Sequence, residues 1–198
     1  MNFKILICVI SITLFSCATP KYDVIIVGGG ASGITAAIQS SRLGSKTLLI
    51  EKTDWLGGML TSAGVSAMDG NYNMPSGFIN EFRDSLVSYY GSLENLKTGW
   101  VSNIMFEPLV GNKILNSIAQ KQDNLEIIFN SRVKNINYKK YNWEVNFDTN
   151  SNSQKVTSKI LIDATELGDL IPMLDIPYSV GMDSKTKFGE KIAPFKSN

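Results

Sequence analysis

Three glycines and one glutamate have a spacing suited to holding a ligand against the backbone. The glycines follow the pattern Gly28-x-Gly30-x-x-Gly33, and Glu51 comes eighteen residues after the last of them. In this pattern the first glycine permits a tight turn, the second lets the backbone approach a pyrophosphate, and the third lets a helix lie close to a sheet. The acid accepts hydrogen bonds from a ribose 2′-hydroxyl. We therefore predict a dinucleotide site, with a purely structural turn as the alternative.

The segments around these residues must form a strand, a helix and a second strand. Residues 22–27 are an apolar run rich in valine and isoleucine, typical of a parallel strand buried on both faces. A helix is expected over residues 32–43 and a second strand over residues 46–51. The backbone N–H groups of Ala31 and Ser32 would then lie at the helix N-terminus, where they favour phosphate.

The stretch after this unit distinguishes two kinds of dinucleotide. A domain that binds NAD normally continues with alternating helices and strands, whereas residues 52–64 are rich in glycine and small residues. Residues 55–65 read Trp-Leu-Gly-Gly-Met-Leu-Thr-Ser-Ala-Gly-Val. They resemble the WxGGxLTSxGV segment of the glutathione-reductase-like flavoproteins. The resemblance is greatest to the bacterial FAD-dependent oxidoreductases related to the flavoprotein subunit of heterodisulfide reductase. The alternative is a glycine-rich surface loop.

That resemblance implies FAD as the cofactor and further binding positions. In these flavoproteins such a loop passes along the ribityl chain and the isoalloxazine ring, which implies contacts from Lys52, Gly58 and Met59. A short valine-containing stretch meets the adenine, and here that role falls to Val133. Their return strand ends in small residues beside the cofactor, where this chain has Thr165.

The rest of the chain predicts an α/β fold. A helix is expected near residues 78–90, and another begins at Pro108 with an apolar face formed by Leu109, Ile114, Leu115 and Ile118. Further strands are expected at residues 125–129, 132–136, 143–147 and 156–162. We predict a Rossmann-like FAD-binding domain, with a parallel sheet plus a β-meander, that is incomplete at its C-terminus.

No side chain is a convincing catalytic acid or base, so the catalytic residues are unknown. Asp163 and Asp169 flank the end of the last expected strand, but hydrogen bonding at a strand end and in a turn explains them better than a catalytic pair does. Many related flavoproteins have glycine where this chain has Glu166. Because the sequence contains no histidine, a Ser-His-Asp or Cys-His unit and a histidyl link to the flavin cannot form within it.

Composition excludes several other kinds of site. The two cysteines are Cys8 and Cys17, so the residues after position 17 offer no disulfide, no zinc site and no iron–sulfur ligand set. We predict no metal site, and any redox chemistry must come from a bound cofactor.

The net charge is +1, without a polybasic face, which argues against a nucleic-acid partner.

Residues 1–17 resemble a bacterial lipoprotein export signal. A short basic start precedes an apolar run over residues 5–15, which is too short to span a bilayer comfortably. Residues 14–17, Leu-Phe-Ser-Cys, resemble a lipobox in which Cys17 receives lipid. An ordinary signal peptide or an uncleaved anchor is the alternative. We expect residues 1–17 to be the signal peptide and residues 18–198 a truncated FAD-binding domain. The protein would then be a lipoprotein anchored in the bacterial cell envelope, on its periplasmic or surface side.

Together these features predict the N-terminal, cofactor-binding portion of an exported FAD-dependent oxidoreductase. A small-molecule substrate would deliver hydride or electrons to the flavin, and a second acceptor would reoxidise it. Two other functions stay open: a truncated, non-catalytic nucleotide-binding module tethered at the cell envelope and, with less support, an NAD-linked dehydrogenase. Because the flavoproteins that the chain resembles are longer, we expect it to be a fragment.

Overall fold

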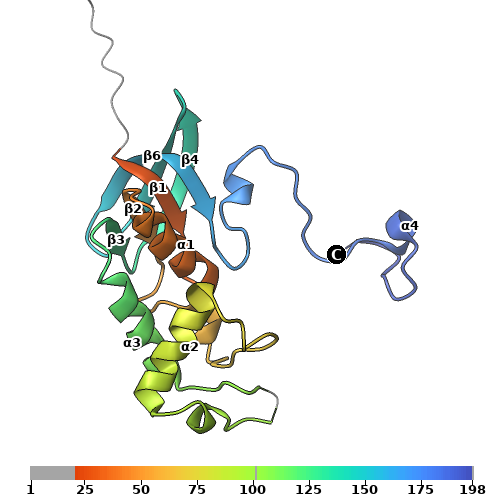
Figure 1. The fold of residues 1–198 in the computed structure, drawn as a ribbon. Coiled ribbons are helices and arrows are strands. Elements are labelled where there is room, and N and C mark those ends of the chain that lie inside the picture. Colours follow the sequence, from red (N-terminus) through yellow and green to blue (C-terminus); the bar gives the residue numbers. More distant parts are fainter. Residues whose placement is uncertain (1–20, 101, 198) are drawn as a thin grey trace, which may run out of the picture.

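The computed structural model describes residues 21–100 and 102–197, which form an α/β domain (Figure 1). The proposed signal peptide and Cys17 lie outside the described residues. One six-stranded sheet has the order β3-β2-β1-β6-β5-β4. Its strands are β1 (Tyr22–Val27), β2 (Thr47–Ile50), β3 (Leu125–Ile128), β4 (Arg132–Lys139), β5 (Asn142–Asp148) and β6 (Ser153–Asp163). The helices are α1 (Ala31–Arg42), α2 (Gly77–Tyr90), α3 (Pro108–Ala119) and the short α4 (Lys185–Phe188), with 3-10 turns η1 (Gly58–Leu60), η2 (Glu94–Leu96) and η3 (Ile171–Met173).

The strand-helix-strand unit is present as the sequence predicted. Strand β1 pairs in parallel with β2, and α1 connects the two. Val24 and Ile26 of β1 contribute to a core with α1, α2 and α3, whereas Ile25 and Val27 contribute to a second core with the antiparallel strands. Both faces of β1 are therefore buried, which explains why this strand is apolar at consecutive positions rather than at alternate ones.

Strand β6 joins the parallel and antiparallel parts of the sheet. Its first half pairs antiparallel with β5, from Ser153 to Ser158, and its second half pairs in parallel with β1, from Ser158 to Asp163. Strands β4, β5 and β6 form the predicted meander. The meander side chains Val145 and Phe147 are fully buried in the same core as Ile25, and each such side chain stabilises the fold by roughly 2 kcal/mol. The meander thus covers the face of the parallel strands opposite the three long helices.

One expectation for α3 was wrong. Leu109 is not on the apolar face, because 49% of its surface is exposed. The buried face consists of Val110, Leu115 and Ile118, with the partly buried Ile114 beside it. The 3.6-residue period explains the difference, since a residue at position 109 shares its helix face with the polar positions 112, 113 and 116 rather than with 110.

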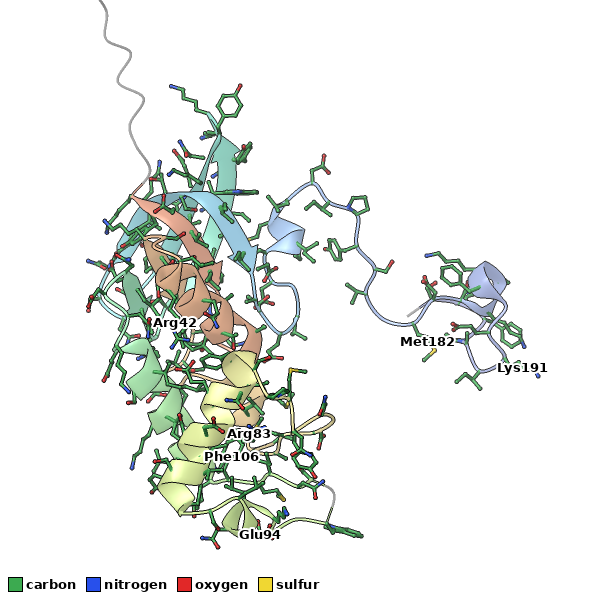
Figure 2. All side chains as sticks on the ribbon, viewed as in Figure 1. Arg42, Arg83, Glu94, Phe106, Met182 and Lys191 are labelled. Atoms are coloured by element: carbon green, nitrogen blue, oxygen red, sulfur yellow. The ribbon has the colours of Figure 1, made fainter. Side chains whose placement is uncertain are left out.

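The C-terminal arm, residues 175–197, leads away from the sheet and ends around α4 (Figure 1). Met182 and Lys191 both lie on this arm, well apart from the helices that carry Arg42 and Arg83 (Figure 2). The arm exposes the apolar side chains of Phe188, Ile192 and Phe195. Within the part of the chain that the structure describes, no helix has the length and apolar character needed to cross a bilayer.

Replacing Gly33 with alanine tests the packing of α1 on the β1 turn. A Cβ atom at position 33 would lie 1.8 Å from the backbone oxygen of Gly28, so the helix would have to move. We expect Gly33→Ala to lower the free energy of unfolding by about 2–3 kcal/mol, measured by urea denaturation. Gln39→Ala on the same helix is the control, expected to change it by less than about 0.5 kcal/mol. Equal stability of the two variants would contradict this packing.

Candidate cofactor-binding site

The carboxyl ends of three adjacent parallel strands meet at one cavity of about 470 Å³, here called the strand-end cavity. Residues that directly follow each strand line it: Gly28 after β1, Glu51 after β2, and Ala164 after β6. In open α/β sheets, ligands bind outside the carboxyl ends of the strands. The cavity volume also lies within the usual range for small-molecule sites.

Eight of the eleven residues predicted to bind the cofactor line this cavity. They come from four separate segments of the chain: Gly28, Gly30, Glu51, Lys52, Gly58, Met59, Val133 and Thr165. The other three belong to the first turn of α1. The side chains of Ala31 and Ser32 are exposed there, and Gly33 is buried under the β1 turn. Ala31 and Gly33 offer only backbone groups, and Ser32 also offers its hydroxyl.

Two of the three motif glycines are required by the fold itself. Gly28 has a φ of +97°, and a Cβ atom there would lie 2.5 Å from the backbone oxygen of Ala164. Gly33 packs against Gly28, as described above. Neither position has room for a side chain, whatever the chain binds.

Gly30 is different, because the fold does not require a glycine there. Its φ is −61°, which any residue adopts. Among the described residues beyond its chain neighbours, the only heavy atom close to a Cβ at this position would be Oε1 of Glu166, at 3.2 Å, the end of a flexible side chain. The space above Gly30 is what a ligand needs in order to approach the backbone, and the position therefore fits a bound diphosphate.

The N-terminus of α1 adds an electrostatic reason for an anion at this point. Gly30 is the N-cap residue and makes no side-chain capping bond, and the first turn of α1 carries no acidic residue. The backbone N–H groups of the first turn lack partners within the helix, and the helix dipole places partial positive charge here. A phosphate at this end would meet both the donors and the dipole.

Glu51 holds the end of β2 against the β1 turn. Its Oε2 accepts a hydrogen bond from the backbone N–H of Gly29 at 2.5 Å, and its Oε1 accepts bonds from the N–H and hydroxyl of Thr53 at 2.8 and 2.7 Å. The residue is buried, with 6% of its surface exposed. A carboxylate has about four acceptor positions, so contact with a ribose hydroxyl remains available and stays a prediction.

The cavity continues along β2 towards the start of β4. The backbone N–H of Ser131 donates to the backbone oxygen of Glu51 at 2.9 Å, which brings Ser131, Arg132 and Val133 to the cavity wall. Arg132 and Lys52 are exposed cations that form no ion pair with any described residue. This end can therefore offer both an apolar wall and positive charge to an adenosine group.

The glycine-rich stretch is packed against the motif at residues 56–58, whereas residues 62–65 are exposed. The backbone N–H of Gly57 donates to the oxygen of Gly29 at 2.8 Å, and Gly30 and Gly57 form an isolated parallel bridge. Gly58 has a φ of +52°, and a Cβ there would lie 3.0 Å from the Cα of Gly30. Gly58 and Met59 thus form part of the cavity wall beside Gly30, and their contact with the ribityl chain and flavin ring stays a prediction.

The turn after β6 is organised by Asp163, as expected for a strand-end residue. Its Oδ1 accepts bonds from the backbone N–H and hydroxyl of Thr165 at 3.0 and 2.6 Å, and its Oδ2 accepts one from the N–H of Leu170 at 3.1 Å. The backbone N–H of Asp169 donates to the hydroxyl of Thr165 at 2.7 Å. Asp163 is therefore a structural residue, and the turn it fixes presents Thr165, Glu166 and Asp169 to the cavity.

Sequence reasoning missed several residues of the cavity wall. Thr53, Arg132, Glu166 and Asp169 were not assigned to the site. The first three are each adjacent in sequence to an assigned residue, and Asp169 lies four residues after Thr165. Their proximity to strand ends was the available signal. In residues 21–100 and 102–197, no group of three or more His, Cys, Asp or Glu side chains is placed to hold a metal ion.

Residues 23–197 match the family model described as FAD dependent oxidoreductase. The chain belongs to this family. FAD is therefore the cofactor. The strand-end cavity fits it, because above Gly30 the backbone is approached only by the flexible Glu166 side chain among the described residues, and the N-terminus of α1 has no side-chain cap.

Similar proteins of known activity match short parts of the chain. The NADH:fumarate oxidoreductase of Klebsiella pneumoniae (strain 342) is 37% identical over 89 residues, which cover 43% of this chain and 9% of that protein. A dihydrolipoyl dehydrogenase of Trypanosoma brucei brucei is 49% identical over 43 residues, covering 22% of this chain and 9% of that protein. The matched parts of the chain thus cover about a tenth of the length of these relatives.

Solved structures show the same fold. The flavoprotein/dehydrogenase from Cytophaga hutchinsonii superposes with a TM-score of 0.59 at 18% identity, covering 81% of this chain and 43% of that one. The structure of AlpK superposes with a TM-score of 0.54 at 14% identity, covering 74% and 31%. At these identities the likeness shows the α/β Rossmann-like fold alone.

Replacing Glu51 with glutamine tests its structural role. Glutamine keeps the shape but replaces one acceptor oxygen with an amide that would face an N–H donor from Gly29 or Thr53. We expect Glu51→Gln to lower the free energy of unfolding by about 1–3 kcal/mol in urea denaturation. Asp54→Asn, an exposed charge removal three residues away, is the control. If both variants unfold like the wild type, Glu51 does not hold the turn.

Proposed function

We propose that this chain is the cofactor-binding part of an exported FAD-dependent oxidoreductase, whose bound flavin exchanges electrons with a small-molecule substrate and a second acceptor. The observation that carries the proposal is the space above Gly30, which the packing of the fold does not require and which, among the described residues, only the flexible end of the Glu166 side chain enters. That space lies at the N-terminus of α1 and opens into the strand-end cavity.

Each part of the cavity suits one part of the cofactor. Val133 and Ser131 would contact the adenine, and Glu51 the adjacent ribose. The first turn of α1 would bind the diphosphate at Gly30, and Met59 would lie beside the ribityl chain. When bound, FAD supplies the capacity to accept and release a pair of electrons. The chain's own residues bind it, orient it and fix the turns around it.

Two finer points of the proposal rest on the sequence. The segment at residues 55–65 supports a relationship to the flavoproteins allied with the heterodisulfide reductase subunit. The pattern of residues 1–17 supports an anchored lipoprotein of the cell envelope, attached to the membrane through Cys17.

FAD binding by the purified chain tests the proposal. We expect FAD fluorescence to be quenched on titration with protein, and Gly30→Ala to weaken binding about tenfold or more, because the added methyl group takes the space of a phosphate. The unfolding transition of Gly30→Ala should match the wild type, since its φ of −61° suits alanine. Gln39→Ala, on the same helix but outside the cavity, is the control for binding. Binding of NAD but not FAD, or unchanged FAD affinity in Gly30→Ala, would contradict the assignment.

The two cysteines allow a matched test of the anchor. The three proteins are expressed in a bacterial host and partitioned between a detergent phase and an aqueous phase. We expect the wild type and Cys8→Ser in the detergent phase and Cys17→Ser in the aqueous phase. The reason is that only a thiol at the lipobox position accepts the lipid. Aqueous partitioning of the wild type, or detergent partitioning of Cys17→Ser, would contradict lipidation at Cys17.

A further inference from the structure

Glu166 has a carboxylate directly over the point where a phosphate would approach the backbone. Its Oε1 lies 3.2 Å from the position of a Cβ on Gly30 and 2.9 Å from the position of a Cβ on Gly58. These two glycines come from different loops that touch each other, so the carboxylate covers their contact. A diphosphate held by the first turn of α1 needs this same space.

The backbone around Glu166 is fixed, but its side chain is not. Asp163 and Thr165 hold the turn through four hydrogen bonds, as described for the site. The Glu166 side chain is exposed and makes no hydrogen bond or ion pair with the residues that the structure describes. The carboxylate can therefore rotate out of the cavity without breaking a hydrogen bond or ion pair, while its point of attachment stays in place.

We propose that Glu166 sets the affinity of the diphosphate position, because its carboxylate occupies that position and must rotate away when a dinucleotide binds. This inference rests on the proposed FAD site. The N-terminus of α1 attracts the carboxylate for the same reason that it attracts a phosphate, so the two anions compete for one place. Lys52 and Arg132, the cations of the cavity wall, form no ion pair with Glu166, so its negative charge is not paired with a side chain in the described part of the chain.

The competition has a specific consequence for ligand choice. A ligand with phosphate groups at Gly30 must displace the carboxylate and remain close to its negative charge, whereas adenosine, which has no phosphate, need not. Glu166 therefore weakens binding of FAD and ADP while leaving adenosine unaffected. We expect the penalty to be about tenfold in dissociation constant at low salt.

Calorimetric titration of the full chain with adenosine, ADP and FAD tests this inference. Glu166→Gln keeps the size of the side chain and removes its charge. This substitution should lower the dissociation constants of ADP and FAD about tenfold and leave that of adenosine unchanged. The gain in affinity should be smaller at high salt, because the charges are screened. Glu190→Gln makes the same chemical change on the C-terminal arm, outside the cavity, and should behave as the wild type. Glu166→Ala gives a second variant, and thermal melts without nucleotide confirm that each protein is folded.

The possible results separate this inference from the proposed function. Unchanged or weaker ADP binding in both Glu166 variants, with FAD still bound, would overturn the inference and leave the FAD site standing. Equal tightening of adenosine and ADP would also overturn it, because the effect would not arise at the phosphates. If neither the wild type nor the variants bind FAD or ADP, the proposed function fails, and the role of Glu166 fails with it.

Discussion

Gly28 brings the ends of β1 and β6 so close together that no side chain fits between them. A Cβ at this position would lie 2.5 Å from the backbone oxygen of Ala164, and the N–H of Ala164 donates to the oxygen of Val27. The same turn receives α1, since Gly33 packs on the oxygen of Gly28. Sheet order, helix position and the opening of the strand-end cavity all depend on this one close approach.

The second constraint on the site is the set of polar contacts that hold its loops. Glu51 ties the end of β2 to Gly29, and Asp163 ties the turn after β6 to Thr165 and Leu170. Both carboxylates accept backbone N–H groups that would otherwise lack partners near a cavity, where an unmade hydrogen bond is costly. The site is thus built on a rigid frame before any ligand contributes, which reduces the ordering cost of binding.

Within that frame, the groups that meet a ligand are mainly backbone atoms and a few exposed side chains. The first turn of α1 supplies N–H groups, and Lys52 and Arg132 supply positive charge at one end of the cavity. Glu166 supplies negative charge over Gly30 at the other. A strand-end cavity in an FAD dependent oxidoreductase therefore combines an attractive helix terminus with a competing anion.

The sequence by itself determined the parallel strand-helix-strand unit, the meander, and eight residues of the cavity wall. Local spacing was sufficient because glycines at positions 28 and 33 and the apolar run of β1 allow few other structures. It misplaced Leu109, whose helix face depends on which side α3 turns to the core. Only the tertiary structure decided that Gly30 is the one motif glycine not required by the fold, and that Glu166 lies over it. Both findings depend on contacts among three segments: the turn after β1, the loop at residues 57–58 and the turn after β6. These segments are far apart in the chain and meet only when the sheet forms.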